Sequence, residues 1–172
     1  LLEKGTCPRD IITRKSIENA IAAVVATGGS TNGVLHLLAI ASEAGIDLEL
    51  EDFDRISSRV PILADLKPWG TFVATDVFKA GGLGLVAREV LKGDLLHGDV
   101  RYVDGRRLSD IAADVEETPG QQVIASIEHP IKETGGLLVL RGNLAPEGCV
   151  IKVSGQKRDV FSGPARVFEG EE

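Results

Sequence analysis

The sequence contains no methionine, only two cysteines and no long apolar run. A complete natural chain starts with Met, whereas this one starts with Leu1 and stops in a charged stretch, so we expect both ends to have been cut. No apolar segment approaches the roughly 20 residues that a bilayer span needs. Residues 1–12 carry charges and a proline where a signal peptide would be apolar. These absences predict a cytoplasmic protein without a membrane partner.

Positive charge is also scarce. The 19 Lys and Arg residues face 26 Asp and Glu residues, which gives a formal net charge of −7. Such a surface repels phosphate backbones, so we expect no nucleic-acid partner. The length of 172 residues and the 43% hydrophobic content allow one folded domain or slightly more.

The two cysteines, Cys7 and Cys149, lie far apart and have no neighbouring Cys or suitably spaced His. This pattern predicts neither a disulfide framework nor a zinc site. It favours two unrelated thiols in a reducing compartment.

Helical periodicity dominates the first part of the chain. Thr13 is a suitable cap for a helix that Gly28-Gly29 ends, and a second apolar helix starts at Ser30 or Thr31 and ends at Gly45. Both are apolar enough to predict buried helices. Shorter helices are expected over 51–58, 73–80, 83–91 and 109–115, with a small hairpin over 100–108.

Short β runs replace helices later in the chain. They cover residues 137–140, 149–153 and 165–168, and Gly, Pro and Asn separate them. We therefore predict an α/β chain with a domain boundary near residue 130.

The residues Thr27-Gly28-Gly29-Ser30-Thr31-Asn32 stand between the two apolar helices. Paired glycines let a ligand approach the backbone, and the hydroxyls, the amide and the unpaired N–H groups of a helix N-terminus favour an anion. A carboxylate or phosphate of a small substrate is the predicted occupant. The alternative is a tight turn in which Ser and Thr only cap the helix.

His36 lies one helical turn after Asn32, on the same face, and could donate a proton or bind substrate. The alternative is a buried, hydrogen-bonded core histidine. Asp65 with Lys67 could be a metal ligand and its charge partner, or a solvated loop pair. Arg141 could bind an acidic group, or lie exposed beside a structural turn.

Several segments, in order, resemble one enzyme family. The resemblance begins with TRKSIENAI, ATGGSTN and LHL at residues 13–21, 26–32 and 35–37, and it continues to the end of the chain. Later matching segments are DFDRIS (52–57), ADLKP (64–68), AGG (80–82), LLHGD (95–99), TGGL (134–137), LRGNLAP (140–146) and GPARVF (163–168). This series resembles the dihydroxy-acid and phosphogluconate dehydratase family.

The resemblance implies a lyase that removes water from a 2,3-dihydroxy acid to give a 2-oxo acid in the biosynthesis of the branched-chain amino acids valine and isoleucine. It implies an iron–sulfur cluster and Mg²⁺ in a full-length enzyme, which would be a homodimer. The family's cluster cysteines, metal ligands, modified lysine and serine base lie outside this chain. We therefore expect no catalytic or metal-binding residue here, and an inactive piece. The predicted substrate-binding residues are Ser30, Thr31, Asn32 and His36.

The resemblance also predicts the architecture. Residues 1–130 would form the helix-rich, C-terminal part of a larger α/β/α domain, and residues 131–172 would begin a β-rich, barrel-like domain. Two other functions stay open. One is a sugar-acid dehydratase acting on phosphogluconate or arabinonate, although the loop at 69–72 fits the dihydroxy-acid branch better. The other is a non-catalytic module for small-acid binding or assembly, whereas a piece of an enzyme predicts exposed apolar groups at Val24, Leu35 and Leu38.

Overall fold

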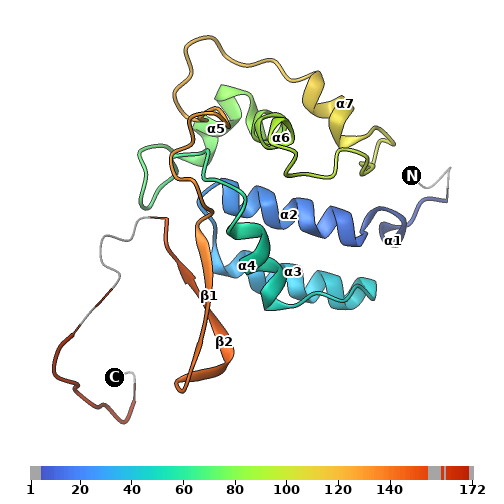
Figure 1. Ribbon diagram of the computed structural model, residues 1–172. Coiled ribbons are helices and arrows are strands. Elements are labelled where there is room, and N and C mark those ends of the chain that lie inside the picture. Colours follow the sequence, from blue (N-terminus) through green and yellow to red (C-terminus); the bar gives the residue numbers. More distant parts are fainter. Residues whose placement is uncertain (1–4, 155–159, 161, 171–172) are drawn as a thin grey trace.

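The computed structural model describes residues 5–154, 160 and 162–170. They form seven helices and one two-stranded antiparallel sheet, which confirms a helix-rich α/β chain whose strands come last (Figure 1). In chain order the elements are α1 (Pro8–Ile11), α2 (Arg14–Ala26), α3 (Thr31–Ala44), α4 (Leu50–Ser57), α5 (Ala74–Ala80), α6 (Gly82–Lys92), α7 (Leu108–Ala113), β1 (Leu137–Gly142) and β2 (Ala145–Lys152).

Helix α2 is the central element. It contacts α3, α4 and α6, and Figure 1 shows it between α6 on one side and α3 on the other. Ile17, Ile21 and Val25 recur every four residues and are almost fully buried. This spacing places them on one stripe of the helix, so they can all enter the core. Phe53 of α4 and Leu85 of α6 pack into the same core.

An extended segment, residues 62–64, runs beside the end of α2, and a later segment, residues 125–132, is hydrogen-bonded to it. The backbone N–H groups of Leu63 and Ala64 both donate to the carbonyl of Ala26, at 2.8 and 3.2 Å. Ile62 N–H donates to the carbonyl of Lys132 at 2.9 Å, and Ala125 N–H donates to that of Leu63 at 2.7 Å. The chain that leads to β1 is therefore hydrogen-bonded to the helical part.

Strands β1 and β2 pair as a hairpin in which Leu137 faces Lys152 and Leu140 faces Cys149. The predicted strands at 137–140 and 149–153 are thus confirmed. The strand predicted at 165–168 is wrong, because these residues are exposed and have no strand partner in the part that the structure describes; Val167 is 89% exposed. The hairpin predicted at 100–108 is reduced to a turn with a single bridge, between Arg101 and Arg107.

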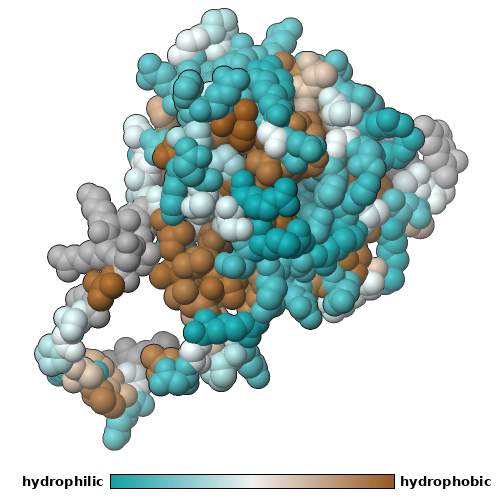
Figure 2. Space-filling view, viewed as in Figure 1, coloured by the Kyte–Doolittle hydropathy of each residue, from teal (hydrophilic) through white to brown (hydrophobic). Residues whose placement is uncertain are grey.

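Helix α3 is more exposed than its composition predicted. Only Val34 and Ala41 are buried, and Leu35 is 66% exposed. Val24 and Leu38 are half-buried. Figure 2 shows further hydrophobic surface around the hairpin, where Leu138 and Leu140 are exposed. Within the described ranges, no helix is long and apolar enough to cross a membrane.

Candidate functional site

The turn between α2 and α3 depends on two glycines. Gly28 and Gly29 have φ values of +85° and +71°, a left-handed conformation that residues with a Cβ avoid. The N–H of Gly29 donates to the carbonyl of Val24 at 2.8 Å, which closes the end of α2. The Thr27 hydroxyl turns back to the carbonyl of Ala23, also at 2.8 Å. The chain therefore reverses sharply, and α3 begins at once.

The four predicted substrate-binding residues lie at the start of α3, and all four are exposed. Ser30 is the N-cap residue, but its side chain makes no capping hydrogen bond. The alternative in which this serine serves as a cap is therefore wrong for Ser30. His36 is exposed, so the alternative of a buried core histidine is also wrong.

At most other helix N-termini a side chain accepts a hydrogen bond from the backbone. In α1, α4, α5 and α7 a carboxylate at the third helical position accepts from the backbone N–H of the N-cap residue. The accepting residues are Asp10, Asp52, Asp76 and Asp110, at 2.7, 3.0, 3.0 and 3.3 Å. The first turn of α3 carries no acidic residue, so the partial positive charge of this helix end is not compensated there.

Helix α6 also begins without a side-chain cap, at Gly81. Its first residues are Gly82, Leu83 and Gly84, which offer no polar side chain. Among the helices described, α3 is therefore the one that combines an uncapped N-terminus with exposed hydroxyl and amide groups.

Ser154, which no sequence pattern had marked as a site residue, lies beside this turn. A Cβ placed on Gly28 would stand 4.0 Å from the Cβ of Ser154. The Ser154 hydroxyl oxygen is buried and has no hydrogen-bond partner among the described residues. A serine after a strand is common, so no local signal indicates that it meets a turn more than 120 positions earlier.

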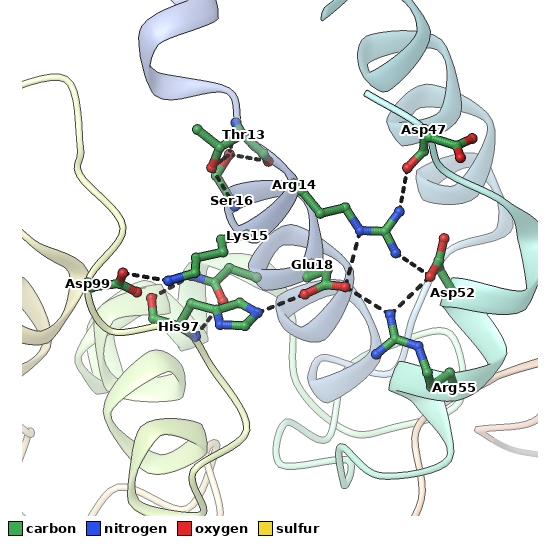
Figure 3. A network of polar contacts seen from close by, with 11 residues as sticks. Thr13, Arg14, Lys15, Ser16, Glu18, Asp47, Asp52, Arg55, His97 and Asp99 are labelled. Atoms are coloured by element: carbon green, nitrogen blue, oxygen red, sulfur yellow. Dashed lines mark hydrogen bonds and ion pairs between the residues drawn. The ribbon is translucent and has the colours of Figure 1, made fainter. Parts of the chain in front are cut away.

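A network of charged groups joins α2, α4 and the loop after α6 (Figure 3). Glu18 accepts from the guanidinium groups of Arg55 at 2.8 Å and Arg14 at 3.2 Å, and its other oxygen lies 2.7 Å from His97 Nε2. Asp52 pairs with both arginines. Nearby, Lys15 pairs with Asp99 at 2.6 Å. This network was not predicted from the sequence, although Arg14 and Glu18 have the spacing of a helical ion pair.

The network shifts the acidities of its carboxylates. Burial acts to raise the pKa of Glu18, but hydrogen bonds from His97, Arg55 and Arg14 outweigh it, so the pKa lies below its usual value. Burial likewise opposes a fall in the pKa of Asp52, and hydrogen bonds from Arg14 and from the Glu49 backbone N–H lower it overall. Both carboxylates thus favour the charged form and hold the helices together.

The remaining predicted candidates have structural partners. Asp65 accepts from the backbone N–H of Thr71 at 3.0 Å, which supports a loop rather than a metal ligand. Arg141 pairs with Glu51 of α4. Cys7 and Cys149 are free and exposed. Within residues 5–154, 160 and 162–170, no group of three or more His, Cys, Asp or Glu side chains is placed to hold a metal ion.

Two family models together match nearly the whole chain. The N-terminal model of dihydroxy-acid/6-phosphogluconate dehydratases matches residues 1–111, and the C-terminal model matches residues 122–172. The chain belongs to this dehydratase family. The ordered segments quoted from the sequence are therefore confirmed as family segments. The boundary near residue 130 between two structural domains stays a prediction.

Curated members of the dehydratase family align with all or nearly all of the chain. It is 56% identical over 172 residues to the dihydroxy-acid dehydratase of Koribacter versatilis and 57% identical over 172 residues to that of Roseiflexus sp. strain RS-1. It is 52% identical to that of a Thermus thermophilus strain over 96% of the chain. These alignments cover only 30%, 31% and 30% of the relatives, so the chain spans about a third of their length.

Proposed function

We propose that this chain is part of a hydro-lyase that converts a 2,3-dihydroxy acid to a 2-oxo acid in branched-chain amino-acid biosynthesis. The family membership and the relatives named dihydroxy-acid dehydratase support this reaction over other classes. The whole enzyme would be a cytoplasmic homodimer whose substrate is a small molecule. The contribution of this chain would be to bind and orient that substrate.

The uncapped N-terminus of α3 carries the proposal for the site. The N–H of Gly33 donates to the carbonyl of Ser30 at 2.9 Å, whereas Thr31 and Asn32, the first two residues of the helix, have no preceding helical turn to accept from their N–H groups. This helix end carries a partial positive charge. Ser30 and Thr31 add exposed hydroxyls, and Asn32 adds an amide. We propose that these groups bind the carboxylate of the acid. His36, one turn later, would donate a hydrogen bond or a proton to an oxygen of the bound substrate.

An iron–sulfur cluster and Mg²⁺ would supply Lewis-acid chemistry to the leaving hydroxyl in the whole enzyme. The described residues do not fit either group. Cys7 lies before α1 and Cys149 lies in β2, and two thiols do not make the usual set of cluster ligands. The ligands would lie in other parts of the enzyme, and no step of the reaction is assigned to a metal here.

The activity is tested with the whole enzyme, expressed from the gene that includes this segment. A branched 2,3-dihydroxy acid should be converted to a 2-oxo acid, which is trapped as its hydrazone and quantified. Phosphogluconate and arabinonate serve as competing substrates. Faster turnover of either sugar acid would move the enzyme to the other branch of the family, and turnover of none would contradict the enzymatic proposal.

The site is tested by Ser30→Ala and Asn32→Ala in the same enzyme. A hydrogen bond to a charged group contributes about 1.5–3 kcal/mol, so each change should raise KM for the dihydroxy acid about tenfold or more. Ser42→Ala is a matched control, because Ser42 is exposed near the other end of the same helix. Unchanged KM in both turn variants would contradict the proposed site.

A further inference from the structure

The chain just before β1 crosses the α2–α3 turn at unusually short range. A Cβ placed on Gly136 would lie 2.5 Å from the carbonyl oxygen of Gly28 and 2.8 Å from its carbonyl carbon. Real Cβ atoms do not approach backbone atoms this closely, and backbone cannot rotate away as a side chain can. Gly136 therefore has no room for any side chain while Gly28 stays in place.

The residues on either side of Gly136 are fixed in the core. Gly135 N–H donates to the carbonyl of Ser57 at 2.7 Å, and a Cβ on Gly135 would lie 2.5 Å from the Ser57 hydroxyl. The Ser57 hydroxyl, itself buried, donates to the carbonyl of Leu137 at 2.5 Å. Leu137 is 3% exposed, and its side chain would be 3.0 Å from a Cβ on Gly29. The segment 135–137 thus rests on α4 on one side and on the turn on the other.

The same segment also fixes the residue that adjoins Ser154. The N–H of Val153 donates to the carbonyl of Gly136 at 2.8 Å. Gly136 consequently faces the turn on the side where a Cβ would stand, and its carbonyl is bonded to the end of the hairpin. A displacement at this one position would move the turn and the Ser154 region together.

We propose that Gly136, with Leu137 beside it, is a positioning residue that sets the place of the Gly28–Asn32 turn for substrate. This inference rests on the proposed function, because it takes that turn as the carboxylate site. Gly136 does not touch the substrate. Its role is to let the hairpin segment lie directly on Gly28, so that the first turn of α3 is held in one place.

Replacing Gly136 by Ala forces a separation. The Cβ must move from 2.5 Å to ordinary van der Waals distance from the Gly28 oxygen, a shift of about 1 Å that either the turn or the hairpin must make. Misplacement of a substrate-orienting group by about 1 Å can cost about 100-fold in rate. We expect Gly136→Ala in the whole enzyme to lower kcat/KM by about 10- to 100-fold, with a rise in KM of at least about fivefold.

The rise in KM separates positioning from simple loss of folded protein. A smaller folded fraction lowers the apparent kcat and leaves KM unchanged, whereas a displaced binding turn changes KM. Gly142→Ala is the matched control, because Gly142 lies in the same hairpin, has no left-handed φ and has nothing within 4 Å of an added Cβ. It should keep the parent KM and kcat.

Leu137→Ala provides a second variant if Gly136→Ala does not fold. It removes the side chain that covers Gly29 without adding a clash, so the turn loses a contact but keeps its space. A rise in KM in this folded variant is expected. Parent-like KM in whichever of the two variants folds, while Ser30→Ala raises KM, overturns the positioning role alone. Parent-like KM in Ser30→Ala and Asn32→Ala overturns the proposed site itself.

Discussion

The two longest helices of the described chain, α2 and α3, begin in different ways. At the start of α2 the Thr13 hydroxyl accepts from the N–H of Ser16 at 3.2 Å, and the Ser16 hydroxyl accepts in return from the N–H of Thr13 at 2.7 Å. At the start of α3 the Ser30 side chain makes no such bond. Both positions hold residues with good capping chemistry, and one of them uses it.

This difference shows what residue type can and cannot indicate. A serine at a helix N-terminus predicts where the helix starts, and α3 does start after Ser30. It does not predict whether the serine hydroxyl accepts a hydrogen bond from its own helix or stays available to a ligand. Charged side chains also surround the capped N-terminus of α2. The uncapped N-terminus of α3 instead has glycines and Leu137 as its neighbours.

Among substitutions at the starts of these two helices, the largest expected loss of stability comes from Gly29→Ala, which changes the turn before α3. A left-handed backbone costs a residue with a Cβ about 1–2 kcal/mol, and the new Cβ would also press on Leu137 at 3.0 Å. We expect a loss of about 2–3 kcal/mol in the free energy of unfolding, measured in urea. Gly45→Ala, with the same φ of +71° but open space around it, should lose about 1 kcal/mol. Equal losses would mean that Leu137 does not constrain the turn.

The next expected loss of stability concerns the N-terminus of α2, which the ion pairs of Glu18 join to α4. Glu18→Gln removes the charge that joins Arg14, Arg55 and His97, and we expect a loss of about 1 kcal/mol at neutral pH, since the arginines are partly exposed. Glu43→Gln, which removes an exposed charge on α3, is the control and should cost less.

The same network predicts an acid-sensitive contribution to stability. The folded pKa values of Glu18 and Asp52 lie below their usual values of 4.5 and 3.8, so the unfolded chain binds protons at higher pH than the folded chain. The stabilisation is fully present above these usual values and is lost as pH falls through the lowered folded pKa values. Unfolding followed from pH 7 downward should show this loss, and Glu18→Gln should flatten it. A curve that the substitution leaves unchanged would contradict the assignment.

Local patterns predicted the helical part of the fold well, because short-range physics decides it. Thr13, Gly28-Gly29 and Gly45 mark the ends of α2 and α3 as expected, and the left-handed φ of Gly45 is the reason that the second helix stops there. The short β run at 165–168 led to a wrong prediction, because a strand needs a backbone partner and residue type does not supply one.

The candidate site was predicted only in part, because local sequence patterns do not show contacts between distant residues. The sequence located the turn and its polar side chains, since they are consecutive. It could not show that Gly136 and Ser154 would meet Gly28, or that Glu18 would meet His97, because these contacts join residues far apart in the chain. The exposure of Leu35 also depends on what covers α3, which helical periodicity does not contain.

The smallest expected change in stability concerns the two N-cap side chains, Thr13 of α2 and Ser30 of α3. Thr13→Ala removes a cap that is in use, so α2 should lose about 1 kcal/mol of stability. Ser30→Ala removes a hydroxyl that caps nothing, so the free energy of unfolding should change by less than about 0.5 kcal/mol. Urea unfolding of the two variants under the same conditions measures the difference. If Ser30→Ala costs as much as Thr13→Ala, then Ser30 caps α3 in solution, its hydroxyl is occupied, and the carboxylate site loses one of its donors. If only Thr13→Ala is costly, the Ser30 hydroxyl is available to substrate, and an increase in KM on its removal reflects binding rather than folding.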